Sequence, residues 1–321
     1  GSIGSELSYQ ALRLSPKKLV LFEQNEFNIY SLEQRLLALD TGVEIVSIIG
    51  DIRNYDRLNT TINQHKPDVI FHAAAYKHVP LMESNPYESI HTNIRGTQNI
   101  ARIASLHNVK KFVMVSTDKA VNPTNIMGAT KRIAEKVIQK LQSSQKNTKF
   151  ITVRFGNVLG SSGSVVPLFK KQIKGGGPVT VTHKDIERYF MSIPEACQLV
   201  LQAGAMGEGG EVFVLDMGQP VKIDDLAREM ISLSGLIPDK DIKIIYTGLR
   251  PGEKMYEELL STDENTLPTQ HKMVSVAKST NNNILFSDNL ERLLEIDSSE
   301  EVFKLHSLIK GILPEFTSKI G

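Results

Sequence analysis

Short runs of β-branched and aromatic residues alternate with amphipathic segments along the first part of the chain, and this rhythm limits the possible folds most strongly. The strand candidates are residues 17–23, 44–51, 68–74, 111–116 and 150–155. The helical patterns between and after them cover residues 31–40, 55–65, 91–108 and 125–142. Because consecutive parallel strands need crossover connections, this order favours a parallel sheet with helices on both faces. The sequence therefore predicts an α/β fold with a doubly wound parallel sheet.

The regular alternation of strand and helix patterns ends after Gly160, where glycine-rich stretches lead into shorter, mixed elements. We expect residues 1–160 to form the sheet domain. Residues 161–321 should form mainly a smaller, mixed α/β substrate-binding lobe and C-terminal helices. Within them, residues 289–313 predict two helices, with residues 297–301 supplying a cap for the second.

Charge and cysteine content exclude several classes of protein. The formal net charge of +1 gives no general attraction to nucleic acid or to an anionic membrane. No apolar run approaches the ~18–20 residues of a membrane helix, and no signal peptide opens the chain. Cys197 is the only cysteine, so we expect a reducing setting and, from its apolar surroundings, a core thiol. The histidines are scattered, and their spacing predicts no metal site.

The chain opens with Gly-Ser-Ile-Gly (Gly1, Ser2, Ile3, Gly4) at the start of a helical pattern, with no strand before it. A Gly-x-x-Gly at this place is typical of the second half of a dinucleotide-binding turn, where backbone approaches a pyrophosphate. Glu23 ends the first strand candidate, where a carboxylate would accept ribose hydroxyls and repel a 2′-phosphate. These features predict a Rossmann-like domain that binds NAD rather than NADP. Since such a sheet would fold poorly without its first strand, we expect the chain to be a fragment of a longer protein.

Seven motifs together resemble one family. They are GSIGSE at 1–6, GDIRN at 50–54, HAAAYKHVP at 72–80, STDKAVNP at 116–123, MGATK at 127–131, RFGNVLGSSGSVVP at 154–167 and RPGEKMYEEL at 250–259. They resemble the extended short-chain dehydrogenase/reductases and, more narrowly, the nucleotide-sugar 4,6-dehydratases of bacterial polysaccharide and glycan biosynthesis. The longer members of that group look like this chain in carrying methionine, here Met127, where a tyrosine is usual. Those members act on UDP-N-acetylglucosamine, keep the configuration at C5 and are anchored in the membrane by helices upstream of the catalytic domain.

The resemblance implies a reaction for which the sequence holds suitable residues. Removal of water across C5–C6 of a hexose is difficult until C4 is oxidised to a ketone, which makes the C5 proton acidic. Bound NAD+ would accept the C4 hydride and return it to C6. By resemblance, Lys119 removes the C5 proton and Asp118 protonates the departing C6 oxygen. Both follow the strand candidate at 111–116, at the end where open α/β sheets bind ligands.

Lys119 is a base only as a free amine, so its ordinary pKa of ~10.4 would have to be lowered by burial or by a nearby cation. Lys131 is a candidate for that cation, whereas Asp118 would oppose the shift, and the balance stays open. By resemblance, Lys131 also holds the nicotinamide ribose, one helical turn after Met127. Because Met127 has no proton to transfer, we expect Asp118 to take the C4 hydroxyl proton, with Thr117 as a hydrogen-bonding aid.

The resemblance divides the other site residues into two groups. The cofactor group is Gly1, Ser2, Ile3, Gly4, Glu23, Asp51, Ile52, Ala73, Ala74, Lys77, Asn93, Ser116 and Lys131. The substrate group, for the diphosphate and uridine, is Asn157, Val165, Val166, Thr180, Thr182, Arg188, Arg250 and Glu253. The two arginines would clamp the pyrophosphate, since a planar guanidinium suits paired phosphate oxygens. We assign no catalytic role to His72 or His78.

The sequence thus predicts an NAD-dependent, C5-retaining UDP-N-acetylglucosamine 4,6-dehydratase domain. A UDP-sugar 4-epimerase is one alternative, but it needs no C5 base, and the Thr-Asp-Lys run at 117–119 speaks against it. A catalytically silent nucleotide-sugar-binding module is another, supported only by Met127. We expect a homo-oligomer and a cytoplasmic domain that reaches the bacterial membrane only through segments upstream of this chain.

Overall fold

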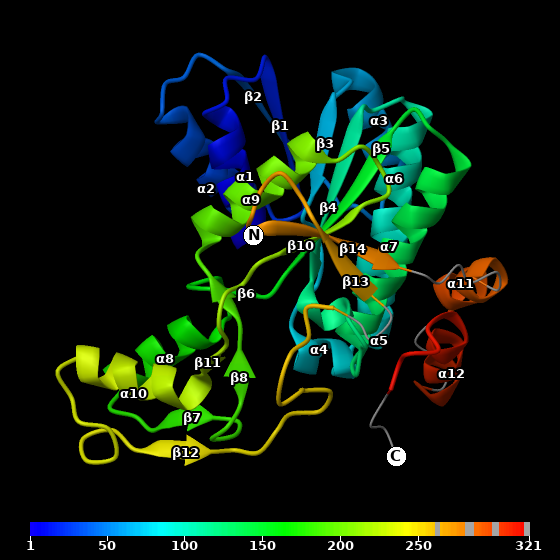
Figure 1. The fold of residues 1–321 in the computed structure, drawn as a ribbon. Coiled ribbons are helices and arrows are strands. Elements are labelled where there is room, and N and C mark those ends of the chain that lie inside the picture. The colour runs from blue at the N-terminus through cyan, green and yellow to red at the C-terminus, as the bar shows by residue number, and fades with distance from the viewer. Residues whose placement is uncertain (261–263, 280–285, 297–301, 318–321) are drawn as a thin grey trace.

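The computed structural model describes residues 1–260, 264–279, 286–296 and 302–317. Its central layer is a six-stranded sheet in the order β13-β14-β10-β5-β4-β3 (Figure 1). The parallel strands are β3 (Val69–His72), β4 (Lys111–Thr117), β5 (Lys149–Phe155) and β10 (Val212–Leu215). The antiparallel strands are β14 (Val274–Ser279) and β13 (Glu264–Pro268). A separate parallel pair consists of β1 (Lys18–Glu23) and β2 (Glu44–Ile49).

Helices cover both faces of the large sheet, as expected for a doubly wound α/β fold. Side chains of β4 alternate between the two faces, because successive residues of a strand point to opposite sides. Phe112 and Met114 join one buried cluster with helices α3 (Tyr55–His65), α6 (Thr97–Leu106) and α7 (Ile126–Ser144). Val113 joins the opposite cluster with α1 (Ser2–Leu12) and α9 (Ile193–Met206). Helix α2 (Glu26–Leu37) packs on β1 and β2.

The five predicted strands are confirmed, with ends that differ by up to two residues. The helical pattern at 91–108 forms two pieces rather than one, because a π-helix, η1 (Ile90–Gly96), precedes α6. Such widened turns are frequent at functional sites. Between β3 and η1 lie two short helices, α4 (Val79–Ser84) and α5 (Pro86–Ser89).

A smaller lobe stands apart from the large sheet in Figure 1. Its core joins apolar side chains of α8 (Val165–Lys174), α10 (Ile223–Leu233) and the parallel pair β7 (Val179–Val181) and β12 (Ile244–Tyr246). Two further pairs of short strands lie between this lobe and the sheet: β8 (Glu187–Arg188) with β11 (Val221–Lys222), and β6 (Asn157–Val158) with β9 (Phe190–Met191).

A single boundary at residue 160 does not separate the two parts. Helix α9 and strand β10 come after it, yet both belong to the large sheet layers. The predicted C-terminal helices are confirmed as α11 (Phe286–Glu295) and α12 (Val302–Ile312), and they pack on α7 and η1 rather than on the small lobe. The predicted cap at 297–301 lies outside the described residues. Within the described ranges, every helix is too short or too polar to serve as a membrane span.

Candidate active site

A cavity of about 680 Å³ lies between the small lobe and the sheet edge where β3, β4 and β5 end. This edge is where open α/β sheets bind ligands. Of the expected site residues, the cavity walls include Gly1, Ser2, Ile3, Gly4, Ala73, Lys77, Ser116, Thr117, Lys119, Met127, Lys131, Asn157, Val165, Thr180, Thr182, Arg188, Arg250 and Glu253. The walls do not include Glu23, Asp51, Ile52, Ala74, Asn93, Asp118 or Val166.

The start of α1 and the end of β1 meet at one side of this cavity. The backbone nitrogen of Gly1 lies 3.7 Å from Glu23 Oε2, and Glu23 Oε1 accepts a hydrogen bond of 3.0 Å from the backbone N–H of Asn25. The first amides of a helix have no partner within it and favour anions. The Glu23 carboxylate thus lies beside the start of α1 but outside the cavity wall, which the small Ala73 and Ala75 help to form.

Three expected cofactor residues are engaged elsewhere. The Asp51 carboxylate accepts hydrogen bonds from the backbone and side chain of Arg53 at 2.8 and 2.7 Å. Ile52 is buried against Gly96, where an added Cβ would lie 2.4 Å from Ile52 Cδ1. Asn93 is fully buried and holds the loop after β3, because its amide exchanges hydrogen bonds of 2.8 and 3.0 Å with the backbone of Tyr76. Asn93 thus does not line the cavity but fixes the backbone of Tyr76, which does.

Thr117 is the last residue of β4, and Asp118 and Lys119 follow it in the 3₁₀ helix η2 (Asp118–Ala120). The Asp118 carboxylate is fully buried, and its Oδ1 accepts hydrogen bonds from Thr117 Oγ1 at 2.8 Å and Lys119 Nζ at 2.9 Å. Among the described residues, Asp118 Oδ2 has no hydrogen-bond partner. The turn thus holds a carboxylate and an amine in direct contact, with one carboxylate oxygen uncommitted.

The sequence left open whether the surroundings of Lys119 raise or lower its pKa, and the charged groups around its amine give the direction. Burial lowers the pKa of Lys119, but the carboxylates of Asp118 and Glu257 outweigh burial, so the pKa lies above its ordinary value. The cation that opposes them is Arg188, not Lys131. In this state the structure favours the ammonium form of Lys119.

Met127 and Lys131 share one face of α7 and line the cavity together. Lys131 Nζ donates a hydrogen bond of 2.7 Å to the backbone carbonyl of Val115, and burial lowers the pKa of Lys131 to about 8. Helix α7 begins beside η2 because Gly128 permits a close approach: an added Cβ would lie 2.1 Å from the backbone oxygen of Lys119. Asn125 caps this helix by accepting a hydrogen bond of 2.8 Å from the Gly128 N–H.

The small-lobe side of the cavity carries the two expected arginines. The Arg188 side chain is buried and donates to backbone carbonyls of Glu187, Lys254 and Met255 at 2.7, 2.8 and 3.1 Å. Arg250 is exposed, and both guanidinium groups approach Glu253 Oε1, at 3.3 Å from Arg188 Nη2 and 3.1 Å from Arg250 Nη2. Although Glu253 is largely buried, which alone raises its pKa, hydrogen bonds and charge from Arg250 hold that pKa below its ordinary value.

Two expected substrate residues have other partners. Asn157 Oδ1 accepts a hydrogen bond of 3.2 Å from Lys119 Nζ, so this side chain contacts the proposed base. Thr180 Oγ1 accepts one of 2.8 Å from Gln172 Nε2. Val165 at the start of α8 lines the cavity, whereas Val166 does not.

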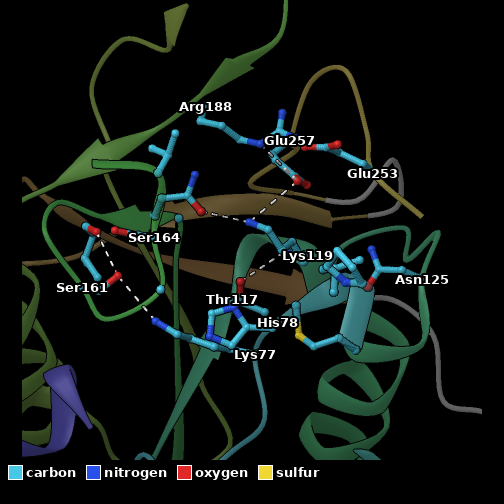
Figure 2. Close-up of a pocket in the computed structure, with 18 of the residues that line it drawn as sticks. Lys77, His78, Thr117, Lys119, Asn125, Ser161, Ser164, Arg188, Glu253 and Glu257 are labelled. Atoms are coloured by element: carbon cyan, nitrogen blue, oxygen red, sulfur yellow. Dashed lines mark hydrogen bonds and ion pairs between the residues drawn. The ribbon is translucent and has the colours of Figure 1, made fainter. Parts of the chain in front are cut away.

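Sequence reasoning missed Glu257 and the position of His78. Glu257 Oε1 lies 3.7 Å from Lys119 Nζ and 3.8 Å from Arg188 Nε (Figure 2). His78 lies against Gly163 and lines the wall. The motif at 250–259 contains Glu257, but nothing in the sequence distinguishes it from the adjacent Glu258.

Cys197 is buried, and burial raises the pKa of its thiol to about 12, which confirms the predicted core thiol. Among the described residues, no group of three or more histidine, cysteine or acidic side chains could hold a metal ion.

Several known proteins are similar to this chain. Capsular polysaccharide biosynthesis protein CapD of Staphylococcus aureus is 58% identical over 82% of this chain, which spans only 44% of CapD. UDP-N-acetylglucosamine 4,6-dehydratase (inverting) of Campylobacter jejuni is 35% identical over 83% of this chain and 77% of that protein. UDP-glucose 4-epimerase of Rickettsia bellii is 37% identical over 82% of this chain and 76% of that protein.

The solved structures confirm the expected fold. The X-ray structure of Pen from Bacillus thuringiensis matches with a TM-score of 0.80 and 39% identity, over 87% of this chain and 85% of that one. The chain thus has the Rossmann-type α/β fold of the short-chain dehydrogenase/reductases. The sequence profile of a family described as polysaccharide biosynthesis protein matches residues 1–279. With most of its length matched, the chain belongs to this family of polysaccharide biosynthesis proteins.

Proposed function

We propose that this protein removes water across C5–C6 of UDP-N-acetylglucosamine in an NAD-dependent reaction that yields the UDP-4-keto-6-deoxy sugar. The observation that carries the proposal is the contact between Lys119 Nζ and Asp118 Oδ1, at 2.9 Å, at the sheet edge of the cavity. A dehydratase needs both a base for a carbon-bound proton and an acid for the departing hydroxyl. One turn supplies both groups.

The sheet side of the cavity fits NAD. The free amides at the start of α1 suit a pyrophosphate, and the neighbouring Glu23 carboxylate suits ribose hydroxyls and repels a 2′-phosphate. Lys131 lines the wall farther along, where its amine would donate to the second ribose. When bound there, NAD+ would accept the C4 hydride and later supply a hydride to C6.

The small-lobe side fits a uridine diphosphate. Arg188 lines the cavity, and its four terminal N–H groups already donate to three carbonyls and to Glu253, so it would attract a diphosphate by its charge and its Nε–H. Arg250 is exposed and is held by Glu253, from which a diphosphate could attract it. Glu253 would then accept ribose hydroxyls.

The protons can move between Asp118, Thr117, Lys119 and the sugar alone. Asp118 is buried behind the wall, so it takes the C4 hydroxyl proton through Thr117 Oγ1, which lines the cavity and donates a hydrogen bond of 2.8 Å to Asp118 Oδ1. Lys119, as the free amine, takes the C5 proton, and Asp118 gives its proton to the C6 oxygen, which leaves as water. Lys119 returns its proton to C5 as a hydride reaches C6. Because one group removes and returns the C5 proton, we infer retention at C5, in contrast to the relative named as inverting.

The relatives carry both dehydratase and epimerase names, so one experiment has to separate these activities. We would follow UDP-N-acetylglucosamine in D₂O with the protein and NAD+ by proton NMR. A new C6 methyl signal with deuterium at C5 is the expected result, and the C5 coupling gives retention or inversion. Formation of the galacto epimer would instead assign an epimerase. Substrate that binds but remains unchanged would assign a silent binding module.

A further inference from the structure

Glu257 is a buried acid in the loop after β12 that meets two cations from other parts of the chain. Its residue is 9% exposed, and its Oε1 faces Lys119 Nζ at 3.7 Å and Arg188 Nε at 3.8 Å. Figure 2 shows the Lys119 side chain extended toward Glu257. Glu257 therefore lies between Lys119, the proposed base, and Arg188, the arginine proposed to bind the diphosphate.

The geometry of this acid differs from that of a structural ion pair. Both distances are longer than a hydrogen bond, and Glu257 Oε2 is shielded from solvent with no hydrogen-bond partner among the described residues. A buried carboxylate that served only stability would be expected to have its oxygens satisfied. Glu257 instead contributes charge at short range to Lys119 and Arg188, and its second oxygen is buried without a partner among the described residues.

We propose that Glu257 is a positioning residue that holds Lys119 in the cavity and sets the pH at which this lysine accepts a proton. The role as base rests on the proposed function. The charged groups that face Lys119 are Asp118 on η2, Glu257 on the loop after β12 and Arg188 on β8. Of the two acids, Asp118 has to carry protons during the reaction, so its charge changes. Glu257 supplies the charge that remains.

This arrangement keeps Lys119 in place while Asp118 is protonated. When Asp118 has taken the C4 hydroxyl proton, its attraction for the Lys119 amine weakens. Asn157 Oδ1, at 3.2 Å, and Glu257 are then the remaining partners of Lys119 Nζ. The negative charge of Glu257 also favours the ammonium form of Lys119, so Glu257 raises the pH above which Lys119 can act as a base.

The substitution Glu257→Gln tests this inference, because it removes the charge and keeps the shape. An opposite charge at this range shifts a pKa by about 1 unit or more, so the acid limb of the kcat/KM profile should move about 1 pH unit lower. The matched control is Glu258→Gln, one residue away, where the carboxylate is bound to Lys254 Nζ at 2.8 Å and does not line the cavity. The control profile should coincide with that of the wild type. The variant Glu257→Asp keeps the charge, so its limb should stay near the wild-type position while kcat falls.

A second readout does not need activity. The rate at which an amine-selective acylating reagent labels Lys119, followed by mass spectrometry across pH, reports the titration of that lysine in the ligand-free protein. The labelling midpoint should fall by about 1 pH unit in Glu257→Gln and stay unchanged in Glu258→Gln. A shifted midpoint in a protein that forms no product would support the role of Glu257 and overturn the dehydratase. Product formation with an unshifted midpoint and an unshifted limb would overturn the role of Glu257 alone.

Discussion

Glu135 and Arg154 form an ion pair inside the protein, with 2.7 Å between Glu135 Oε2 and Arg154 Nη2 and both residues fully buried. This pair lies directly behind the candidate active site. Ser116, at the end of β4, donates a hydrogen bond of 2.6 Å to Glu135 Oε1, and Arg132 Nη1 approaches Glu135 Oε2 at 3.0 Å. Burial raises the pKa of Glu135, but Arg154 and Arg132 together lower it to about 2, so the carboxylate stays charged. The strand end that carries Thr117 and Asp118 is thereby fixed to α7.

Replacement of Glu135 by glutamine should destabilise the protein strongly. It removes the charge that pairs with Arg154 and Arg132, and removal of one partner from a buried pair costs about 3–5 kcal/mol. Urea denaturation measures this change in the free energy of unfolding. The control is Glu44→Gln, which breaks the partly exposed pair with Lys18 at 2.9 Å and should cost less than about 1 kcal/mol. Similar losses for the two variants would contradict a structural role for the buried network.

Gly128→Ala should disturb both stability and activity. The added Cβ would lie 2.1 Å from the backbone oxygen of Lys119, so α7 and η2 would have to separate. Overpacking of this kind costs about 1–3 kcal/mol, and the shift displaces the proposed base. Gly175→Ala is the matched control, because its Cβ would meet nothing closer than 3.4 Å. Unfolding curves and product formation check both variants, and a fully active Gly128→Ala protein would show that the contact is unimportant.

The sequence predicted the sheet and the turn after β4 because local signals determine them. Strands such as 111–116 are recognised by a local pattern of apolar residues. Residues just past the carboxyl end of a parallel strand lie at the ligand-binding edge of the sheet, independently of contacts made by distant segments. Lys119 accordingly lines the cavity, whereas the adjacent Asp118 is buried behind the wall. The placement of Cys197 in the core followed from helical spacing of apolar residues in the same way.

Long-range contacts could not be predicted from the same signals. Glu257 and Glu258 are adjacent and chemically identical, and only the path of the loop after β12 buries one and leaves the other paired with Lys254. In the same way, Arg188 acts on Lys119 because the small lobe folds over the sheet, whereas the sequence suggested Lys131. Asn157 lines the cavity, and the hydrogen bond that its Oδ1 accepts from Lys119 Nζ was not predicted from the sequence.

Lys131 should make stability depend on alkaline pH. Its pKa is about 8 in the folded protein and about 10.4 in an unfolded chain, so between these values the unfolded state binds more protons. The free energy of unfolding then rises with pH across this window. Lys131→Met lacks this contribution, so the stability of the wild type relative to the variant should increase from about pH 8 to about pH 10. Denaturant titrations at several pH values measure the difference, and a constant difference would exclude a depressed pKa at Lys131.

Met127→Leu should leave most of the activity. Met127 is 3% exposed and carries no transferable proton, so a volume-conserving replacement should cost less than about 1.5 kcal/mol. Product formation should fall by far less than the roughly 100-fold that follows removal of a proton-transferring group. Steady-state kinetics and thermal unfolding of the same sample separate the two effects. A loss of about 100-fold in a normally folded Met127→Leu protein would mean that the methionine itself is required for the reaction.

Asp118→Asn should block the reaction at its first step. The amide cannot take the C4 hydroxyl proton, and the Asp118 carboxylate has only Thr117 and Lys119 as hydrogen-bond partners among the described residues, so no neighbouring acid replaces it there. Mixing this variant with NAD+ and UDP-N-acetylglucosamine should produce no absorbance of reduced nicotinamide. Lys119→Gln keeps Asp118, so it should still reduce NAD+ and then stall before loss of water, with reduced cofactor accumulating. If Asp118→Asn reduced NAD+ as Lys119→Gln does, another group would take the C4 proton, and Asp118 would be left with protonation of the C6 oxygen alone.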